Sequence, residues 1–592
     1  MGRKQSMRAH PRDGGFLADP SHRAEAEVGV ENLGVSDTAR STSSPRRRAD
    51  PDGGTAYEGE PMDGPQDPHQ HPQPRLAKAG RAMALATLVS RVTGFGRTLA
   101  LVAALGLGSR LLDAHTAANT LPNSIYDLVL GGALAGVLVP LLVRHDDEAF
   151  AQRLLSLIVY ALAAAVVVTM VFAPQIVDLC APGFTPEQRR LTITFTRFFL
   201  PQVLFYGVGT ALAAVLNTRG RMAAPMWAPV ANNLVVIATA VAYLAIGGGH
   251  RMEELTRAQT LLLSVGTTAG VAVQMLLLMS AGRRAGFRPR LRGDLRGVGL
   301  RRLVGMAGWA VVAVVASQAA LLVANRLAST AGAGAVGVYA NAYTLFQLPY
   351  AIITVSLITG VLPRMSRAAA RRDLAQVTAE LSQSLRLSGV ALLPVAALLI
   401  ALGPHITAVL FAHGNASPSA VALTGSVLSA YGLALVPFCG YQILIRGFYA
   451  LGDTRTPALI GVLVSAVTAV AAWAASALVP GPAVLVGLAA GYAMASTVGL
   501  VVAALVLRAR LGRVDGHRLL STHTRTAIAA VGTGVAALAV TRTVSPAIGA
   551  GWSGSLVVLL AAGAVAAVLY PVAGRLLRIT ELRVLFSALR PA

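Results

Sequence analysis

The stretch RLLSLIVYALAAAVVVTMVFAPQI, residues 153–176, decides the fold class. Its only charged residue is Arg153 at the first position, and a helix needs about 20 apolar residues to cross a bilayer. The chain of 592 residues is 54% hydrophobic and 13% charged, whereas soluble domains carry about 25% charged residues. The sequence therefore predicts an integral membrane protein.

Similar apolar runs recur to the end of the chain, and we count about fourteen of them. Continuous runs exclude a closed barrel, whose strands alternate between apolar and polar residues. We therefore expect an all-α polytopic membrane protein. The expected spans are 82–107, 116–143, 153–176, 191–217, 223–247, 259–281, 303–328, 336–363, 383–404, 420–450, 455–479, 482–508, 523–545 and 551–575.

The arginines mark one side of the membrane. Segment 282–302 holds eight arginines against the single acid Asp294, whereas loop 329–335 has no charge and loop 249–258 balances its arginines with acids. Because cytoplasmic flanks carry an excess of basic residues, we expect a multi-pass protein of the cell membrane with both termini in the cytoplasm. The net charge of +23 then belongs to membrane flanks, and no nucleic-acid partner is expected.

An internal repeat indicates two lobes. Pro140 matches Pro363 and Pro225 matches Pro457, at offsets of 223 and 232 residues, with similar polar and glycine residues around them. The offset corresponds to six spans, so both copies have one orientation, and the lobes are related by a pseudo-two-fold axis along the membrane normal. A chance likeness between apolar runs is the alternative. The expected division is a disordered cytoplasmic tail at 1–78, a six-helix lobe at 79–282, a basic cytoplasmic loop at 283–300, a second six-helix lobe at 301–510, and a terminal helix pair with a cytoplasmic end at 511–592.

The first span holds the candidate binding residues Arg91 and Arg97, in SRVTGFGR at 90–97. An arginine at the bilayer centre costs at least about 2.5–3.5 kcal/mol, so it persists where it meets water, a counter-ion or a substrate. Gly94 and Gly96 are expected to bend the helix and turn both arginines toward one cavity. For Arg91, which lies nearer the cytoplasmic end, snorkelling to the interface is an equally good reading.

Three further charged residues complete the candidate binding set. Asp127 lies inside the second span. Its expected role is that of a counter-ion for an arginine, a group that titrates during transport, or half of a structural ion pair. Asp113 lies at the start of that span, and Arg326 lies late in the seventh, near enough to the outer face to snorkel. The turn formed by Asp453, Arg455 and Pro457 reads as a helix cap and a structural gate element.

The chemistry of these residues favours an anionic ligand. A guanidinium group holds phosphate oxygens through parallel charge-assisted hydrogen bonds, and it suits a cationic drug poorly. The sequence has no Walker loop, zincin helix or His/Cys metal spacing, so we expect no catalytic residues, no metal, no cofactor and no enzymatic activity.

At these residues the chain resembles the MurJ (MviN) family of lipid II flippases, within the multidrug/oligosaccharidyl-lipid/polysaccharide exporter superfamily. The resemblance implies fourteen helices, a groove for a lipid tail beside the terminal pair, and alternating access. It implies as substrate the undecaprenyl-diphosphate-linked peptidoglycan precursor, and it places the family's cavity arginines on Arg91 and Arg97 and its outer acid on Asp113. The matching stretches are SRVTGFGR (90–97), LPNSIYDLVLGGALAGVLVP (121–140), LPQVLFYG (200–207), LNTRGRMAAPMWAPVANNL (216–234), FQLPYAIITVSLITGVLPRMSR (346–367) and RGFYALGDTRTP (446–457).

Two departures leave the substrate open. In the second helix, the family often has an arginine where this chain has Tyr126. In the eighth helix, it often has another where this chain has Thr344 or a neighbour. Arg326 of the seventh helix is the candidate to compensate for these losses. The alternatives are export of another polyprenyl-linked glycan, export of small drugs on the same fold, and a membrane-embedded glycosyltransferase. The tail either recruits cell-wall synthesis proteins or only extends into solvent.

Overall fold

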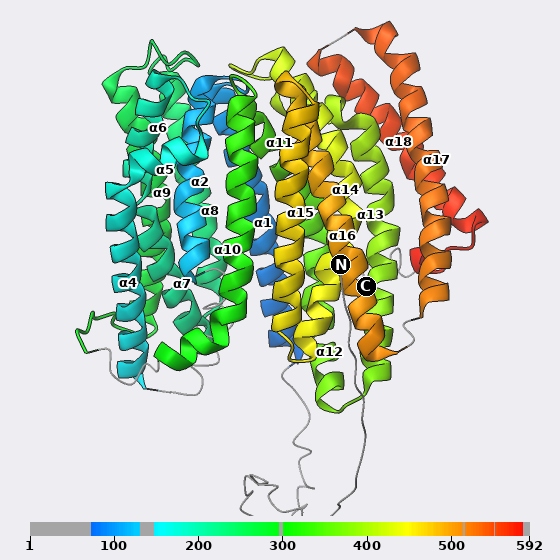
Figure 1. Ribbon diagram of the computed structural model, residues 1–592, viewed down its shortest axis with the longest axis horizontal. Helices are drawn as coiled ribbons and strands as arrows, with labels where there is room; N and C mark the ends of the chain where they lie inside the picture. The colour runs from blue at the N-terminus through cyan, green and yellow to red at the C-terminus, as the bar shows by residue number, and fades with distance from the viewer. Residues whose placement is uncertain (1–72, 131–146, 295–299, 513–514, 550, 584–592) are drawn as a thin grey trace, which may run out of the picture. The chain divides into compact units, whose positions relative to one another are not determined.

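The computed structural model describes residues 73–130, 147–294, 300–512, 515–549 and 551–583, and these residues form helices and no strand (Figure 1). Thirteen helical segments within these ranges are long and apolar enough to cross a membrane. The expected second span, 116–143, begins in α2, and its remainder from residue 131 lies outside the described residues, as does the tail up to residue 72. The predicted all-α polytopic fold is confirmed.

The helices fall into two halves and a terminal pair along the chain. In the first half they are α1 (Gln73–Leu105), α2 (Arg110–Leu130), α4 (Glu148–Val171), α5 (Ala173–Cys180), α6 (Pro186–Phe199), α7 (Gln202–Thr218), α8 (Ala223–Ala245) and α9 (Arg257–Arg284). In the second half they are α10 (Leu300–Thr330), α11 (Ala335–Pro349), the π-helical turn η1 (Tyr350–Thr354), α12 (Val355–Ala370), α13 (Leu374–Phe411), α14 (Pro418–Ala450), α15 (Arg455–Leu478), the 3₁₀ turn η2 (Gly481–Ala483) and α16 (Val484–Leu511). The terminal pair is α17 (Gly516–Ile548) and α18 (Trp552–Leu576).

Prolines account for three breaks in the expected spans. The third span ends early, at Val171, and Pro174 opens the separate short helix α5. The fourth span divides at Pro201 into α6 and α7, and the eighth passes through the π-helical turn that follows Pro349. A proline cannot donate the backbone hydrogen bond of a continuous helix, so the helix ends or changes its hydrogen-bonding pattern there.

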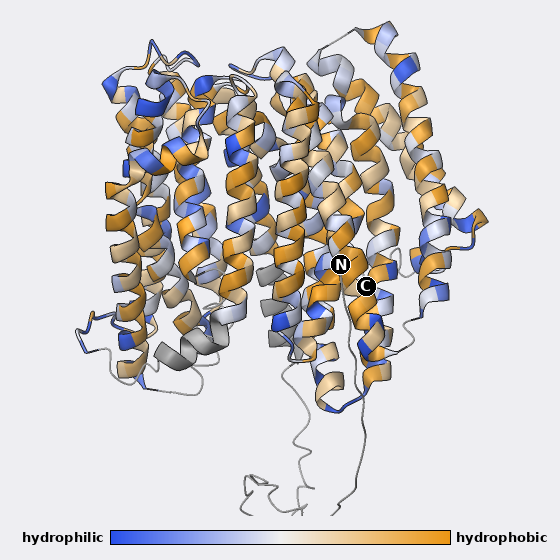
Figure 2. Cartoon of the chain, in the orientation of Figure 1, coloured by the Kyte–Doolittle hydropathy of each residue, from blue (hydrophilic) through white to orange (hydrophobic). Residues whose placement is uncertain are grey.

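Helix packing follows the two halves of the sequence. In the first half, which we call the N-lobe, α8 packs against α1 and α9, α2 against α6, and α7 against α4 and α9. In the second half, the C-lobe, α14 packs between α13 and α16, and α15 against α10 and α16. The terminal pair packs on α13. Apolar residues cover the middle of the helices, and hydrophilic ones gather toward the ends and loops (Figure 2).

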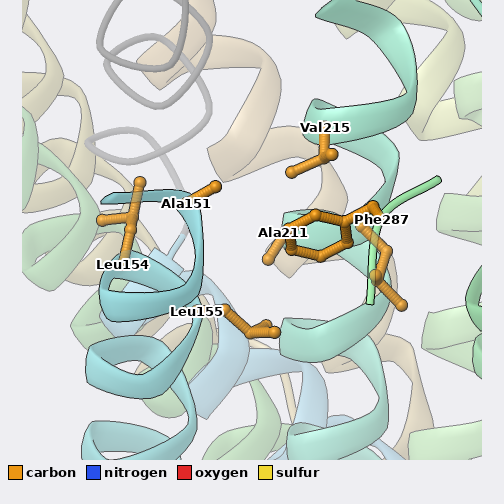
Figure 3. Close-up of a pocket in the computed structure, with 7 residues that line it drawn as sticks. Ala151, Leu154, Leu155, Ala211, Val215 and Phe287 are labelled. Carbon is orange, nitrogen blue, oxygen red and sulfur yellow. The ribbon is translucent and has the colours of Figure 1, made fainter. Parts of the chain in front are cut away.

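The segment after α9 is held on the N-lobe. Phe287 is buried between α4 and α7, where its neighbours include Leu155 and Val215 (Figure 3). The Gln152 side chain donates to the Arg288 carbonyl at 3.1 Å, and the Arg292 amide donates to Ser156 Oγ at 2.8 Å. The space left beside Phe287 is about 10 Å³, which is no more than one water needs. This contact is therefore packing and not a ligand site.

Candidate functional site

Arg97 lies on α1 at the wall formed by α2 and α7. Its charge acts on buried His115 of α2 and on Tyr206 of α7, so the guanidinium lies near both rings. The Arg97 Nε atom is buried without a hydrogen-bond partner, and none of the ion pairs in the described part of the chain includes Arg97. Arg97 is therefore half-buried, and its Nε N–H group is left without an acceptor.

The N-lobe wall around Arg97 is polar and aromatic. The His115 ring lies edge-on to Phe199 and its Nε2 atom is 3.3 Å from Thr267 Oγ1. The Tyr126 hydroxyl, where the family often has an arginine, is 2.7 Å from Thr210 Oγ1, and its ring lies 5.7 Å from that of Tyr206. Sequence reasoning missed His115 and Tyr206, because a single polar ring in an apolar run is usually a satisfied core residue.

Gly94 allows close packing between α1 and α8, and the bend expected at Gly94 and Gly96 stays a prediction. The helix is continuous from Gln73 to Leu105. A Cβ at Gly94 would lie 3.3 Å from Nδ2 of Asn233, which donates to Thr93 Oγ1 of α1, so this glycine allows close approach to α8. Arg91 is half-buried and lies six residues, or about 1.7 turns, before Arg97, and in an unbroken helix positions six apart point about 120° away from each other. That both arginines reach one cavity stays a prediction.

Asp113 joins the two lobes. Its carboxylate is buried and accepts the backbone N–H groups of Gly334 and Gly337, both at 2.7 Å. These residues form the N-terminus of α11, where backbone donors lack partners within the helix and the dipole favours a negative charge. An N-lobe carboxylate therefore caps a C-lobe helix.

More contacts between the lobes lie at the same end of the molecule, which we call the closed end. The backbone N–H of Asn415 donates to the Ala103 carbonyl at 3.0 Å, and the Asn415 side chain donates to the Ala104 carbonyl at 2.9 Å. The Ser417 amide donates to the Leu107 carbonyl at 2.9 Å. The loop between α13 and α14 thereby donates hydrogen bonds to the carbonyl groups at and just after the end of α1.

Arg326 and Asp127 also bridge the lobes. Arg326 Nη1 donates to the Leu179 carbonyl at 3.0 Å, close to the closed end. Exposed Asp127 accepts from the Gln318 side chain of α10 at 3.4 Å. Neither contact brings these residues to Arg97, and their binding of substrate stays a prediction.

The turn at Asp453 lies at the opposite end, which we call the arginine-rich end. Asp453 accepts from the Thr456 amide at 3.0 Å and pairs with Arg510 of α16, while Arg455 lies 5.2 Å over the ring of Trp309 in α10. Burial alone raises the pKa of Asp453, but hydrogen bonds from Thr456 and Arg510 outweigh it and lower the pKa to about 2. Pro457 is buried in the first turn of α15, so the turn fastens α15 to its own lobe.

The decisive comparison is with protein families. Residues 101–561 match the family model described as lipid II flippase MurJ. The chain belongs to the MurJ family. It is 30% identical over 392 residues to the probable lipid II flippase MurJ of Rhizobium meliloti (strain 1021), covering 64% of this chain and 72% of that protein. It is also 30% identical over 395 residues to the lipid II flippase MurJ of Burkholderia cenocepacia, covering 64% and 75%.

Solved structures show the same fold. A lipid II flippase MurJ in an inward closed conformation matches with a TM-score of 0.67 at 18% identity, over 83% of this chain and 98% of that one. An inward-facing multidrug resistance MATE family transporter of the MOP superfamily matches with a TM-score of 0.58 at 15% identity, over 72% and 95%. The chain is therefore a multi-pass MurJ-family protein with the transporter fold that the MATE proteins share.

Proposed function

We propose that this protein carries lipid II, the undecaprenyl-diphosphate-linked peptidoglycan precursor, from the inner to the outer leaflet of the cell membrane by alternating access. Membership of the MurJ family supports the substrate. The single observation that carries the mechanism is Arg97, whose Nε atom is buried and unpartnered. A diphosphate cannot enter hydrocarbon unaided, and a guanidinium group can replace the water that the phosphate oxygens lose.

The direction of transport rests on the distribution of arginine. Because basic flanks lie on the cytoplasmic side of membrane proteins, the arginine-rich end and both termini are assigned to the cytoplasm. The closed end then faces outward, and the arrangement of contacts corresponds to a state sealed toward the outside. Passage to an outward-open state requires the Asp113 cap on α11 to separate. The process moves a lipid without forming or breaking a covalent bond, so we assign no enzymatic role.

The experiment is depletion of the protein followed by complementation. Arg97→Ala should leave lipid-linked precursor inaccessible to reagents that label only the outer leaflet, with a loss of at least ten-fold. Arg97→Lys should recover only part, because an ammonium group lacks the paired donors of guanidinium. Arg284→Ala, at an exposed position of the arginine-rich end, is the matched control.

Normal labelling with Arg97→Ala at equal membrane levels would remove Arg97 from the mechanism. Mass analysis of the precursor that accumulates tests the substrate separately. Tyr126 in place of a family arginine makes another polyprenyl-linked glycan the second candidate. Accumulation of such a glycan, with lipid II unchanged, would favour it.

A further inference from the structure

A large groove lies on the C-lobe, away from Arg97. It is a groove of about 1130 Å³ between α13, α14, α16 and the first turns of α17. No residue of α1, α2, α11 or α18 lines it, so it is separate from the arginine site. Its apolar lining includes Leu385, Leu444, Leu500, Leu507, Leu519 and Leu520.

Glycines shape the floor of this groove. A Cβ at Gly389 of α13 would lie 2.4 Å from Nε2 of His523, and one at Gly440 of α14 would lie 2.9 Å from Leu500. The His523 Nδ1 atom is 2.9 Å from the Leu519 carbonyl, which fixes the ring in the groove. On the other side Leu520 is 70% exposed, so the groove is reached from the protein surface.

The length of the groove fits one leaflet. Its lining on α13 runs from Ala375 to Gly389, which corresponds to about 21 Å of helix. The hydrocarbon of one leaflet is about 15 Å thick, half of a bilayer core. The groove therefore runs from the interface at the arginine-rich end to about the middle of the bilayer.

Positive charge lies at the mouth of the groove. Arg508 and His517 line it and are exposed, and Arg508 takes part in none of the ion pairs between described residues. The acid Asp515 also lines the groove, and its carboxylate is paired with the guanidinium group of Arg518 at 3.9 Å. An apolar channel that ends in an uncompensated guanidinium group has the layout of an acyl chain joined to a phosphate.

We propose that this groove binds an anionic phospholipid of the leaflet at the arginine-rich end. One acyl chain lies along α13 and α14, and the head-group phosphate contacts Arg508 and His517. The bound lipid fills the seam between α16 and α17, so it stabilises the terminal pair on the C-lobe.

The test is native mass spectrometry of the full-length protein with phosphatidylglycerol, phosphatidylethanolamine of the same chains, and undecaprenyl phosphate as probes. Phosphatidylglycerol should be retained over phosphatidylethanolamine. Arg508→Gln should lower its retention about five-fold, as expected for one basic residue near an anionic head group, whereas Arg284→Gln should not. Ala504→Trp fills the groove and should abolish retention, while Ala564→Trp, at an exposed position of α18, should preserve it.

Three results would overturn the proposal. They are equal retention of both phospholipids, phosphatidylglycerol retention unchanged by Arg508→Gln and Ala504→Trp, and undecaprenyl phosphate displacing phosphatidylglycerol from the groove, which would make it a site for the substrate tail. Ala379→Trp, also in the groove lining and exposed, replaces Ala504→Trp if that variant fails to fold.

Discussion

Asp113 and Asp453 do similar local work at opposite ends of the molecule, and the difference lies in what they join. Each carboxylate accepts backbone N–H groups at the start of a helix. Asp453 caps a helix of its own lobe and is paired with Arg510, whereas Asp113 caps a helix of the other lobe and meets no cation in the described structure. The contact between the lobes, which we propose separates during transport, is thus built without an ion pair, whereas the contact within one lobe includes one.

The largest effect is expected from Asp113→Ala. It leaves two buried backbone donors of α11 without an acceptor, and hydrogen bonds to charged groups contribute about 1.5–3 kcal/mol each. The closed end should open, and transport should fall at least ten-fold. The measurement is disulfide formation between cysteines placed at Ala103 and Asn415, with Cys180 and Cys439 replaced.

Undiminished cross-linking in Asp113→Ala would show that the cap on α11 does not hold the lobes together. Asp113→Asn is the graded variant, because an amide oxygen still accepts one of the two hydrogen bonds.

Gly334→Ala tests the same contact through shape. A Cβ there would lie 2.2 Å from the Cα of Gly108, so the lobes cannot approach as closely. Gly332→Ala is the matched control, since it also has a positive φ but no atom within 4 Å of its Cβ. Cross-linking should fall several-fold only in Gly334→Ala, and an equal loss in both variants would indicate backbone strain instead of a clash.

A smaller effect is expected at the arginine-rich end. Arg510→Gln removes a partly exposed ion pair, which contributes up to about 1 kcal/mol. Thermal stability should fall slightly and cross-linking at the closed end should not change. Reduced cross-linking would mean that the Asp453 turn also governs the contact between lobes.

The smallest effect is a pH dependence. The pKa of Asp453 is lowered from 3.8 to about 2, so its contribution to stability is present above pH 3.8 and is lost as pH falls through the folded value. The difference in Tm between the protein and Asp453→Asn should therefore be constant from pH 8 to 5. A difference that declines across that range would contradict the lowered pKa.

Much of the fold was predictable because bilayer thickness fixes the length of an apolar run. That rule does not locate breaks within a run: the span expected at 153–176 breaks before Pro174, where the helix loses a backbone donor. The close contact of Gly94 with α8 was less predictable. Glycines occur both at bends and at close helix contacts, and the contact is seen only from the position of Asn233.

The sequence identified candidate site residues by their type, but it did not identify the groups that they contact. Arg97 drew attention because a charge at membrane depth is costly. The partners of Asp113 lie more than 200 residues away and are backbone groups, which carry no signature in the sequence. For the same reason the Leu179 carbonyl that accepts from Arg326 was not foreseeable.

On the C-lobe side the Asp113 cap involves no side chain, because α11 contributes only backbone N–H groups. Among substitutions at Gly334 and Gly337, only proline removes a backbone donor, and other residues disturb the contact through added bulk or backbone strain. In a population of sequences the two partners therefore face unequal mutational risk.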